Sequence, residues 1–273
     1  MITNIKSYII NLKKYKNKYD LCLERLNKLK LQLYRFDALS IKNENESNIK
    51  KITYPSVQYT IKNGRTGHNN IGSTGAIGCY LSHIALWKKL VESNDNMYII
   101  FEDDVDINNN IKNINEKINK YLINITNECK DWDIIYLGFF KLFPYLDNNN
   151  KNNKNYYKVD DFVYGCHSYI INKKGAKKLL EKALPIVDQL DSYISYMILS
   201  NQLNGYIPKD SFFIQNNIYP STIQTDFSII PPILKYDDKV VLNVFIFIIF
   251  FFILFFYLLY KYIKQVNINK KYN

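Results

Sequence analysis

An apolar run leads directly into acidic residues in the stretch MYIIFEDDVDI, residues 97–107. If the chain stays extended there, Glu102, Asp104 and Asp106 point to one side and Asp103 points to the other. Crowded carboxylates raise one another's pKa, and a divalent cation relieves their repulsion. Mn²⁺ or Mg²⁺ fits this run best, because both take oxygen ligands and are often held by one or two carboxylates together with substrate phosphates.

We therefore interpret the acidic run as a site for a metal bound to a diphosphate. A solvated acidic turn, or the N-cap of the next segment, is an equally open alternative. Zinc is disfavoured, because no histidine or cysteine lies close to the run in the sequence.

A second stretch, GAIGCYLSH, runs from Gly75 to His83. Its small residues permit the backbone to approach a ligand closely, and the start of a helix offers free N–H groups to an anion. The simpler interpretation is that Ser82 and His83 only satisfy local hydrogen bonds. The pair is no catalytic dyad by itself, since successive helical residues point about 100° apart.

The elements that must position these residues begin with a strand, a helix and a second strand over residues 7–39, a pattern that predicts a parallel sheet. The helix carries leucines at 21, 23, 26 and 29. Ligands of such sheets bind beyond the carboxyl ends of the strands, where the acidic run lies. The further expected elements are a loop at 41–75, a helix at 79–93, a strand at 97–101, a helix at 108–129, a strand at 132–138, a loop tip at 147–155, a strand at 166–172 and a helix at 173–184.

The chain of 273 residues has a formal net charge of +11, which suits anionic partners such as nucleotide phosphates or anionic lipid. A nucleic-acid partner is not expected, because no basic-aromatic motif or zinc-finger spacing is present. The chain has 4 cysteines and no C-x-x-C pair. Reduced thiols therefore fit best, which favours a domain facing the cytosol.

A run of apolar residues from Val240 to Tyr260 is long enough to cross a bilayer as a helix. We expect a catalytic domain at 1–232, a linker at 233–239, a transmembrane helix at 240–263 and a basic tail at 264–273. The lysines after the span would place the tail in the cytosol, whereas the absence of a signal peptide favours a cytosolic domain. We give the second argument more weight and expect a single-pass C-terminal anchor.

The stretch IGCYLSHIALWKKLVESNDNMYIIFEDDVDI resembles the core of glycosyltransferase family 25, whose hallmark is a G-C-x-x-S-H helix followed by a strand that ends in E-D-D. YIINLKK, RFDAL, DWDIIYLG and CHSYIINKKGAKKLLE resemble further family segments in the same order. The resemblance covers Tyr8 to Thr225. Ala76 stands where many members have glutamate, and lysines replace arginines after the first strand.

The resemblance implies a GT-A-like α/β fold, with a Rossmann-type, mostly parallel sheet flanked by helices. It also implies a UDP-sugar donor and a Mn²⁺ site whose ligands come from Asp104, Glu102 and Asp103. Asp191 and Asp188 are candidate catalytic bases, although an ordinary helix-start carboxylate is an equally open reading of each. The implied donor-binding residues are Asn11, Lys14, Asp37, Gly78, Ser82, His83, Glu102, Asp103, Gln215 and Ser221.

The expected function is therefore metal-dependent, inverting transfer of a hexose, galactose or glucose, from a UDP-sugar to a hydroxyl group. The acceptor would be a glycan, a glycolipid or a protein. The alternative is a catalytically inactive, membrane-anchored protein that binds sugar nucleotides or serves as a scaffold.

Overall fold

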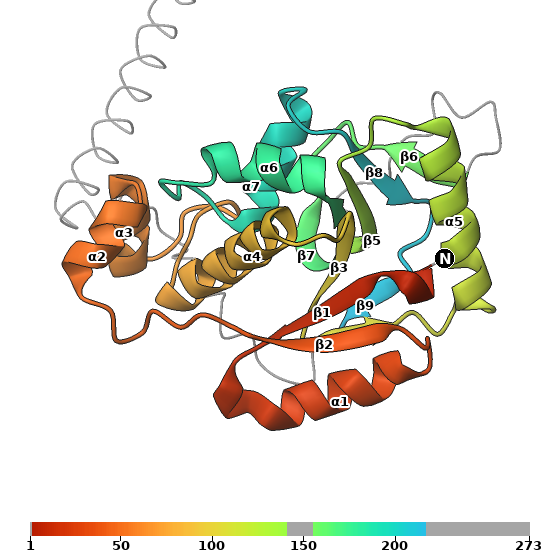
Figure 1. Ribbon diagram of the computed structural model, residues 1–273. Coiled ribbons are helices and arrows are strands. Elements are labelled where there is room, and N and C mark those ends of the chain that lie inside the picture. Colours follow the sequence, from red (N-terminus) through yellow and green to blue (C-terminus); the bar gives the residue numbers. More distant parts are fainter. Residues whose placement is uncertain (1, 141–154, 217–273) are drawn as a thin grey trace, which may run out of the picture. The chain divides into compact units, whose positions relative to one another are not determined.

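The first elements of the structure form the β-α-β unit that the sequence predicts. Strand β1 (Lys6–Asn11) leads through helix α1 (Lys16–Asn27) into strand β2 (Gln32–Asp37), and the two strands pair in parallel. The computed structural model describes residues 2–140 and 155–216 of the chain (Figure 1).

The remaining elements follow in chain order. The other helices are α2 (Glu46–Ile52), α3 (Pro55–Asn63), α4 (Thr74–Glu92), α5 (Ile114–Glu128), α6 (Lys173–Lys182) and α7 (Leu190–Leu199), with short 3-10 turns at Ile2–Asn4 and Lys13–Tyr15. The other strands are β3 (Met97–Glu102), β4 (Val105–Ile107), β5 (Ile134–Phe140), β6 (Tyr156–Lys158), β7 (Tyr164–Asn172), β8 (Gly205–Pro208) and β9 (Phe213–Gln215).

The strands join in one mixed sheet with the order β2-β1-β3-β7-β5-β8-β6. Parallel pairing joins β1 to β2, β1 to β3 and β5 to β8, whereas β7 is antiparallel to both β3 and β5. The strands β2, β1, β3, β5 and β8 therefore all run the same way, and β7 runs against them. Strand β4 pairs with β9, which also pairs with β5.

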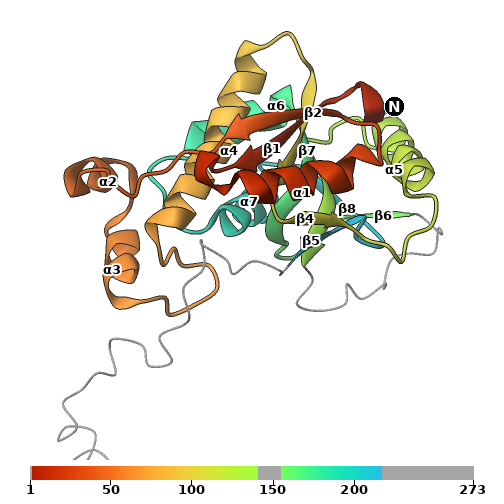
Figure 2. The ribbon, with the colours of Figure 1, turned by 90° about the horizontal axis from the view of Figure 1, so that it is seen from below.

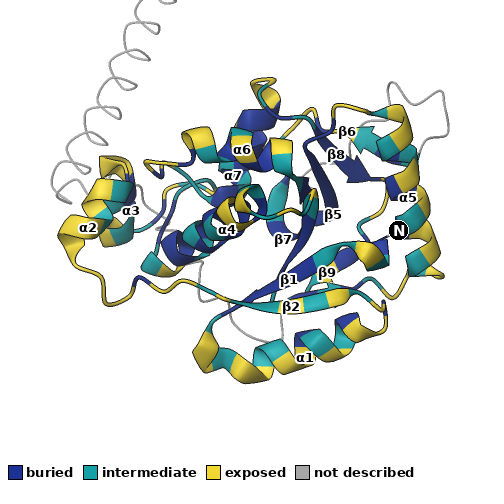
Figure 3. Ribbon diagram, in the orientation of Figure 1, coloured by how far each residue is buried: buried dark blue, intermediate teal, exposed yellow. Residues whose placement is uncertain are grey.

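Two hydrophobic layers enclose the sheet. On β3, Tyr98 and Ile100 belong to the cluster formed with α4, α6 and α7, whereas Ile99 and Phe101 belong to the cluster formed with α1 and α5. This alternation follows the period of two of a strand. Figures 1 and 2 show the helices on the two sides. Figure 3 shows that β1, β5 and β8 are largely buried, whereas β2 at the edge of the sheet is not.

Helix α4 confirms the helix expected at 79–93, and Tyr80, Ile84 and Trp87 are buried on its core face. Helix α1 differs from the prediction, because Leu21 is exposed and Cys22 takes its place beside Leu26 in the core. A small thiol behaves as a buried hydrophobe.

The expected loop over residues 41–75 is wrong, because this segment contains helices α2 and α3. The Asn45 side chain caps α2 by accepting a hydrogen bond from the Ser47 N–H, and Pro55 starts α3. Both helices are short, and the burial of Val57 and Thr60 anchors α3. Local capping and packing thus stabilise helices in a segment whose polar composition suggested a loop.

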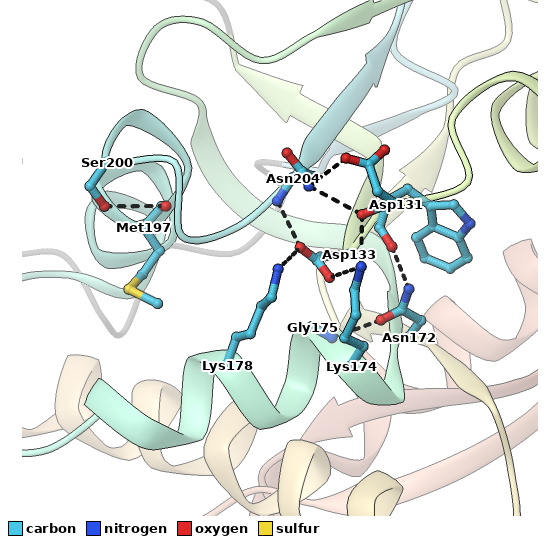
Figure 4. A network of polar contacts seen from close by, with 10 residues as sticks. Asp131, Asp133, Asn172, Lys174, Gly175, Lys178, Met197, Ser200 and Asn204 are labelled. Atoms are coloured by element: carbon cyan, nitrogen blue, oxygen red, sulfur yellow. Dashed lines mark hydrogen bonds and ion pairs between the residues drawn. The ribbon is translucent and has the colours of Figure 1, made fainter.

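A polar network fixes the start of β5 against α6 (Figure 4). The fully buried Asp133 carboxylate accepts hydrogen bonds from Lys178 Nζ at 2.5 Å and from the Asn204 N–H at 2.9 Å. Gly175 lets the helix start approach closely, because a Cβ there would lie 2.5 Å from the Asp133 carbonyl oxygen. The aspartate of the WDIIYLG segment therefore has a structural role.

The described residues, 2–140 and 155–216, belong to one compact unit. The predicted linker, transmembrane helix and basic tail lie outside the described residues, as does nearly all of the predicted loop tip at 147–155. Among the helices described within 2–140 and 155–216, none is long and apolar enough to span a bilayer.

Candidate functional site

The carboxyl ends of three neighbouring strands meet at one edge of the sheet. Asn11 at the end of β1 is in register with Asp37 on β2, and Ile10 is in register with Glu102 on β3. A cavity of about 370 Å³ opens at this edge. It is lined by residues from these strand ends, the segment after β2 and the start of α4: Ile10, Leu12, Lys14, Tyr15, Lys18, Ala38, Leu39, Ser40, Ile41, Lys42, Ser73, Thr74, Gly75, Gly78, Cys79, Glu102, Asp103 and Asp104.

The acidic run does not stay extended, which corrects the predicted alternation. Strand β3 ends at Glu102, and the chain turns at Asp103 and Asp104 before β4. The turn places Glu102, Asp103 and Asp104 together on the cavity wall. Asp106 instead pairs with Arg25 at 3.6 Å.

Neighbouring amide side chains hold the two aspartates of the turn. Asn11 Nδ2 donates to Asp103 Oδ2 at 2.6 Å, and Gln215 Nε2 donates to Asp104 Oδ2. The other Asp104 oxygen, Oδ1, is buried and has no hydrogen-bond partner. Burial, with the nearby charge of Glu102, raises the pKa of Asp104 to about 7, and burial also raises the pKa of Asp103.

Glu102 extends toward α4, where it meets two residues of the GCYLSH segment. Cys79 Sγ lies 3.9 Å from Glu102 Oε1, and His83 Nε2 lies 3.5 Å from the same oxygen. Burial raises the pKa of Glu102 to about 7, with the charges of Asp103 and Asp191 adding to the effect. The structure thus brings a cysteine and a histidine to the acidic run, which removes the sequence-based reason for disfavouring zinc.

Two predicted donor-binding residues on α4 pack against the segment that follows β2. The fully buried Ser82 Oγ donates to the Gly78 carbonyl at 2.7 Å and accepts from the Leu39 N–H at 2.8 Å. A Cβ on Gly78 would lie 2.6 Å from the Leu39 carbonyl oxygen. These contacts support the local hydrogen-bond interpretation of Ser82, while Gly78 also lines the cavity.

The predicted donor-binding residues Asn11 and Asp37 are the last residues of β1 and β2. Asn11 is buried, and its side chain contacts Asp103, Tyr15 and Arg35. Asp37 is exposed and pairs with Arg35 at 3.3 Å. Asn11 is therefore positioned to orient Asp103, and neither residue lines the cavity.

Three lysines also line the cavity: Lys14, Lys18 and Lys42. The charge of Lys18 lowers the pKa of both Asp103 and Asp104, against the larger effect of burial. Of these three lysines, only Lys14 was predicted from the sequence. Lys18 belongs to the first turn of α1 and Lys42 to the segment after β2, so only their position at the sheet edge reveals them.

The two candidate bases lie near the start of α7 and do not line the cavity. Asp191 Oδ2 accepts from the Gly165 N–H at 3.0 Å, and its Oδ1 accepts from the Ser192 N–H at 2.8 Å. Burial raises the pKa of both Asp191 and Asp188. Asp191 lies near enough for its charge to act on Glu102. Ser221 lies outside the described residues.

A family model described as "Glycosyltransferase family 25 (LPS biosynthesis protein)" matches residues 4–194. The chain belongs to glycosyltransferase family 25. The match includes the whole β-α-β unit, α4 and the acidic turn, so the elements that form the cavity are family 25 elements.

Curated family 25 relatives include Procollagen galactosyltransferase 1-A of Xenopus laevis, which is 26% identical over 201 residues, covering 73% of this chain and 32% of that protein. Procollagen galactosyltransferase 2 of Homo sapiens is 27% identical over 174 residues, covering 63% of this chain and 27% of that protein. The chain thus spans about a third or less of the length of these two relatives.

A solved glycosyltransferase, involved in glycosylation of the major capsid of PBCV-1, aligns with 71% of this chain and 65% of its own. The identity is 9% and the TM-score is 0.32, which is too low to support an argument about function.

Proposed function

We propose that this family 25 chain is a metal-dependent glycosyltransferase that moves a hexose, galactose or glucose, from a UDP-sugar to a hydroxyl group of a glycan, glycolipid or protein, with inversion. The main support for this proposal is the cavity at the strand ends, which is lined by Glu102, Asp103 and Asp104 together with three lysines. Acidic and basic groups around one space suit a ligand that is a diphosphate with a cation.

The proposed cofactor is Mn²⁺ or Mg²⁺, with Asp103 and Asp104 as its ligands and Glu102 as a further candidate. The residues fit such an ion, because the buried Asp104 Oδ1 has no partner and both aspartates line the cavity. Asn11 donates a hydrogen bond to Asp103 Oδ2, and Gln215 donates one to Asp104 Oδ2. These hydrogen bonds fix the orientation of the two carboxylates. When bound, the ion would neutralise charge on the departing nucleoside diphosphate.

The lysines Lys14, Lys18 and Lys42 supply positive charge for the same phosphates. Lysine acts as a flexible point charge and does not need the fixed geometry of an arginine. This role agrees with the replacement of arginines by lysines after the first strand of this chain.

Asp191 is the proposed general base, with Asp188 as the second candidate. The acceptor hydroxyl would attack the anomeric carbon, break the bond to the diphosphate and give its proton to this carboxylate. Burial raises the pKa of Asp191, which strengthens it as a base. The Gly165 and Ser192 N–H groups hold both of its oxygens in place.

We further propose that the sheet and its flanking helices form a GT-A-type domain anchored by a transmembrane helix at 240–263. The support for the anchor is the apolar run from Val240 to Tyr260. The proposed location of the catalytic domain is the cytosolic face of a membrane.

The test is a panel of sugar nucleotides, with release of nucleoside diphosphate measured with and without Mn²⁺. We expect turnover of UDP-galactose or UDP-glucose that depends on the ion and falls at least about 100-fold in Asp104→Asn. Asp106→Asn is the matched control, because Asp106 belongs to the same acidic run but pairs with Arg25 away from the cavity. Binding of UDP without any turnover would favour the catalytically inactive protein instead.

A further inference from the structure

Three side chains with different metal-binding atoms converge at the wall of the cavity. Cys79 and His83 lie four residues apart on α4 and so share one face of that helix. Glu102 approaches them from the end of β3. The ligand atoms of these three residues, Cys79 Sγ, His83 Nε2 and a Glu102 carboxylate oxygen, all lie within 4.8 Å of one another.

The His83 imidazole is fully buried, and its Nε2 atom has no hydrogen-bond partner. Its other nitrogen, Nδ1, lies 2.7 Å from the Tyr169 hydroxyl, which also accepts a hydrogen bond from Trp87 Nε1 at 3.0 Å. A buried polar atom without a hydrogen-bond partner is destabilising, and Nε2 lies 3.5 Å from Glu102 Oε1 without a hydrogen bond to it, so it is available as a metal ligand.

We propose that Cys79, His83 and Glu102 bind a divalent transition-metal ion of the zinc type. Glu102 then belongs to this site, which leaves Asp103 and Asp104 for the Mn²⁺ or Mg²⁺ of the proposed function. Thiolate, imidazole and carboxylate are the ligands zinc takes in proteins, whereas Mg²⁺ and Mn²⁺ favour oxygen ligands alone. This inference rests on the geometry of the three residues and holds whether or not the chain transfers a sugar.

The surroundings of the cluster suit such an ion. A divalent ion with one thiolate and one carboxylate has no net charge, which lowers the free-energy cost of burying it. The contact between His83 Nδ1 and the Tyr169 hydroxyl would orient the imidazole, as outer hydrogen bonds commonly do at metal sites. Cys79 and Glu102 also line the cavity, so an ion could reach these ligands from the cavity. Binding would release the thiol proton to solvent.

The experiment is a titration of the full chain, stripped with a chelator, with Co²⁺ as a spectroscopic probe for the zinc site. We expect one equivalent to bind with the charge-transfer band of a thiolate ligand and the visible bands of a four-coordinate ion. Cys79→Ser should remove the thiolate band, and His83→Gln should weaken the affinity by at least about tenfold. Zn²⁺ should displace the cobalt, whereas Mn²⁺ should not.

Two controls separate this site from the others. Cys129→Ser should leave the cobalt spectrum unchanged, because Cys129 is equally a partly exposed free thiol but contacts Tyr156 instead. Asp104→Asn should keep the cobalt spectrum and lose Mn²⁺ binding, so that the two metal proposals fail or stand separately.

A second measurement needs no variant and therefore does not depend on whether one folds. The wild-type chain is alkylated with and without Zn²⁺, and the modified cysteines are read by mass spectrometry. We expect Zn²⁺ to protect Cys79 and to leave Cys129 reactive. Alkylation of Cys79 at the same rate with Zn²⁺, or a cobalt spectrum that Cys79→Ser does not alter, would overturn the proposal.

Discussion

Burial pushes two carboxylates of the acidic run toward their neutral forms. Glu102 and Asp104 both have their pKa raised to about 7, chiefly because the charged forms lose water. The charge of Asp103 raises the pKa of Glu102 further, and the charge of Glu102 does the same for Asp104. A divalent cation would reverse this preference, because it binds the ionised form. The raised pKa values therefore link metal affinity to pH.

We expect the affinity of the full chain for Mn²⁺ to fall as the pH drops below about 7, by roughly tenfold per pH unit for each proton that the ion must displace. Calorimetric titration of Mn²⁺ between about pH 5.5 and pH 8.5 measures this slope. Asp104→Asn should abolish most of the binding at every pH. An affinity that stays constant across this range would contradict the buried carboxylate site.

The same groups affect the stability of the metal-free protein with a definite sign. Their folded-state pKa values lie above the ordinary values of 4.5 for glutamate and 3.8 for aspartate. The folded state therefore binds their protons more tightly than the unfolded state does. Their contribution to stability is full below about pH 4 and is lost as the pH rises through about 7.

Residue types alone identified part of the site. Glu102, Asp103 and Asp104 were recognisable because they are adjacent in the sequence and follow a buried strand. The cluster of Cys79, His83 and Glu102 was not, because 23 residues separate Cys79 from Glu102 and only the pairing of β3 inside the sheet brings them together. Lys18 and Lys42 could not be recognised as cavity residues from the sequence, because the chain contains many lysines.

At the scale of elements, the cavity depends on how α4 packs against the segment after β2. Gly78 allows this packing, since its missing side chain leaves room for the Leu39 carbonyl. The Ser82 hydroxyl then accepts the Leu39 N–H, which would otherwise lack this partner. Both residues belong to the motif that suggested ligand contact, yet their contacts lie between two parts of the protein.

We expect Gly78→Ala to lower the free energy of unfolding by roughly 1–3 kcal/mol, because the added Cβ would meet a backbone atom that cannot rotate away. Thermal and denaturant unfolding measure the change. Gly67→Ala is the control, because a Cβ there would make only an ordinary contact of 3.7 Å with Asn70 Oδ1. Equal stability of Gly78→Ala and wild type would show that the two segments separate easily.

Strands β1, β2, β3, β5 and β7 and helices α1, α4, α5 and α6 followed from apolar patterns, because β3 is a continuous apolar run and α4 buries residues at helical spacing. The sequence did not predict the short strands β4, β6, β8 and β9 or helix α7. Helices α2 and α3 were not predicted from their apolar patterns. They are short, they carry many exposed polar residues, and their positions depend on contacts with distant residues, such as the hydrogen bond from the Tyr54 N–H to the Ile186 carbonyl at 2.8 Å. Periodicity carries little information over one or two helical turns.

At the scale of the whole chain, the described cavity and the predicted anchor belong to different parts of the sequence. Every residue that lines the cavity lies between Ile10 and Asp104 in the sequence. The apolar run from Val240 to Tyr260 comes more than 100 residues later. Metal binding and membrane association should therefore be separable by truncation.

We expect deletion of residues 240–273 to move the protein from the membrane fraction to the soluble fraction without changing its affinity for Mn²⁺. An apolar run of 20 or so residues matches the roughly 30 Å hydrocarbon core of a bilayer, and its removal leaves no comparable stretch in the printed sequence. Fractionation after alkaline extraction measures the association. Replacing residues 240–260 with leucines should restore it, because length and hydrophobicity, and not the native side chains, determine insertion. If the full chain is already soluble without detergent, the anchor is wrong, while the metal measurements still test the cavity.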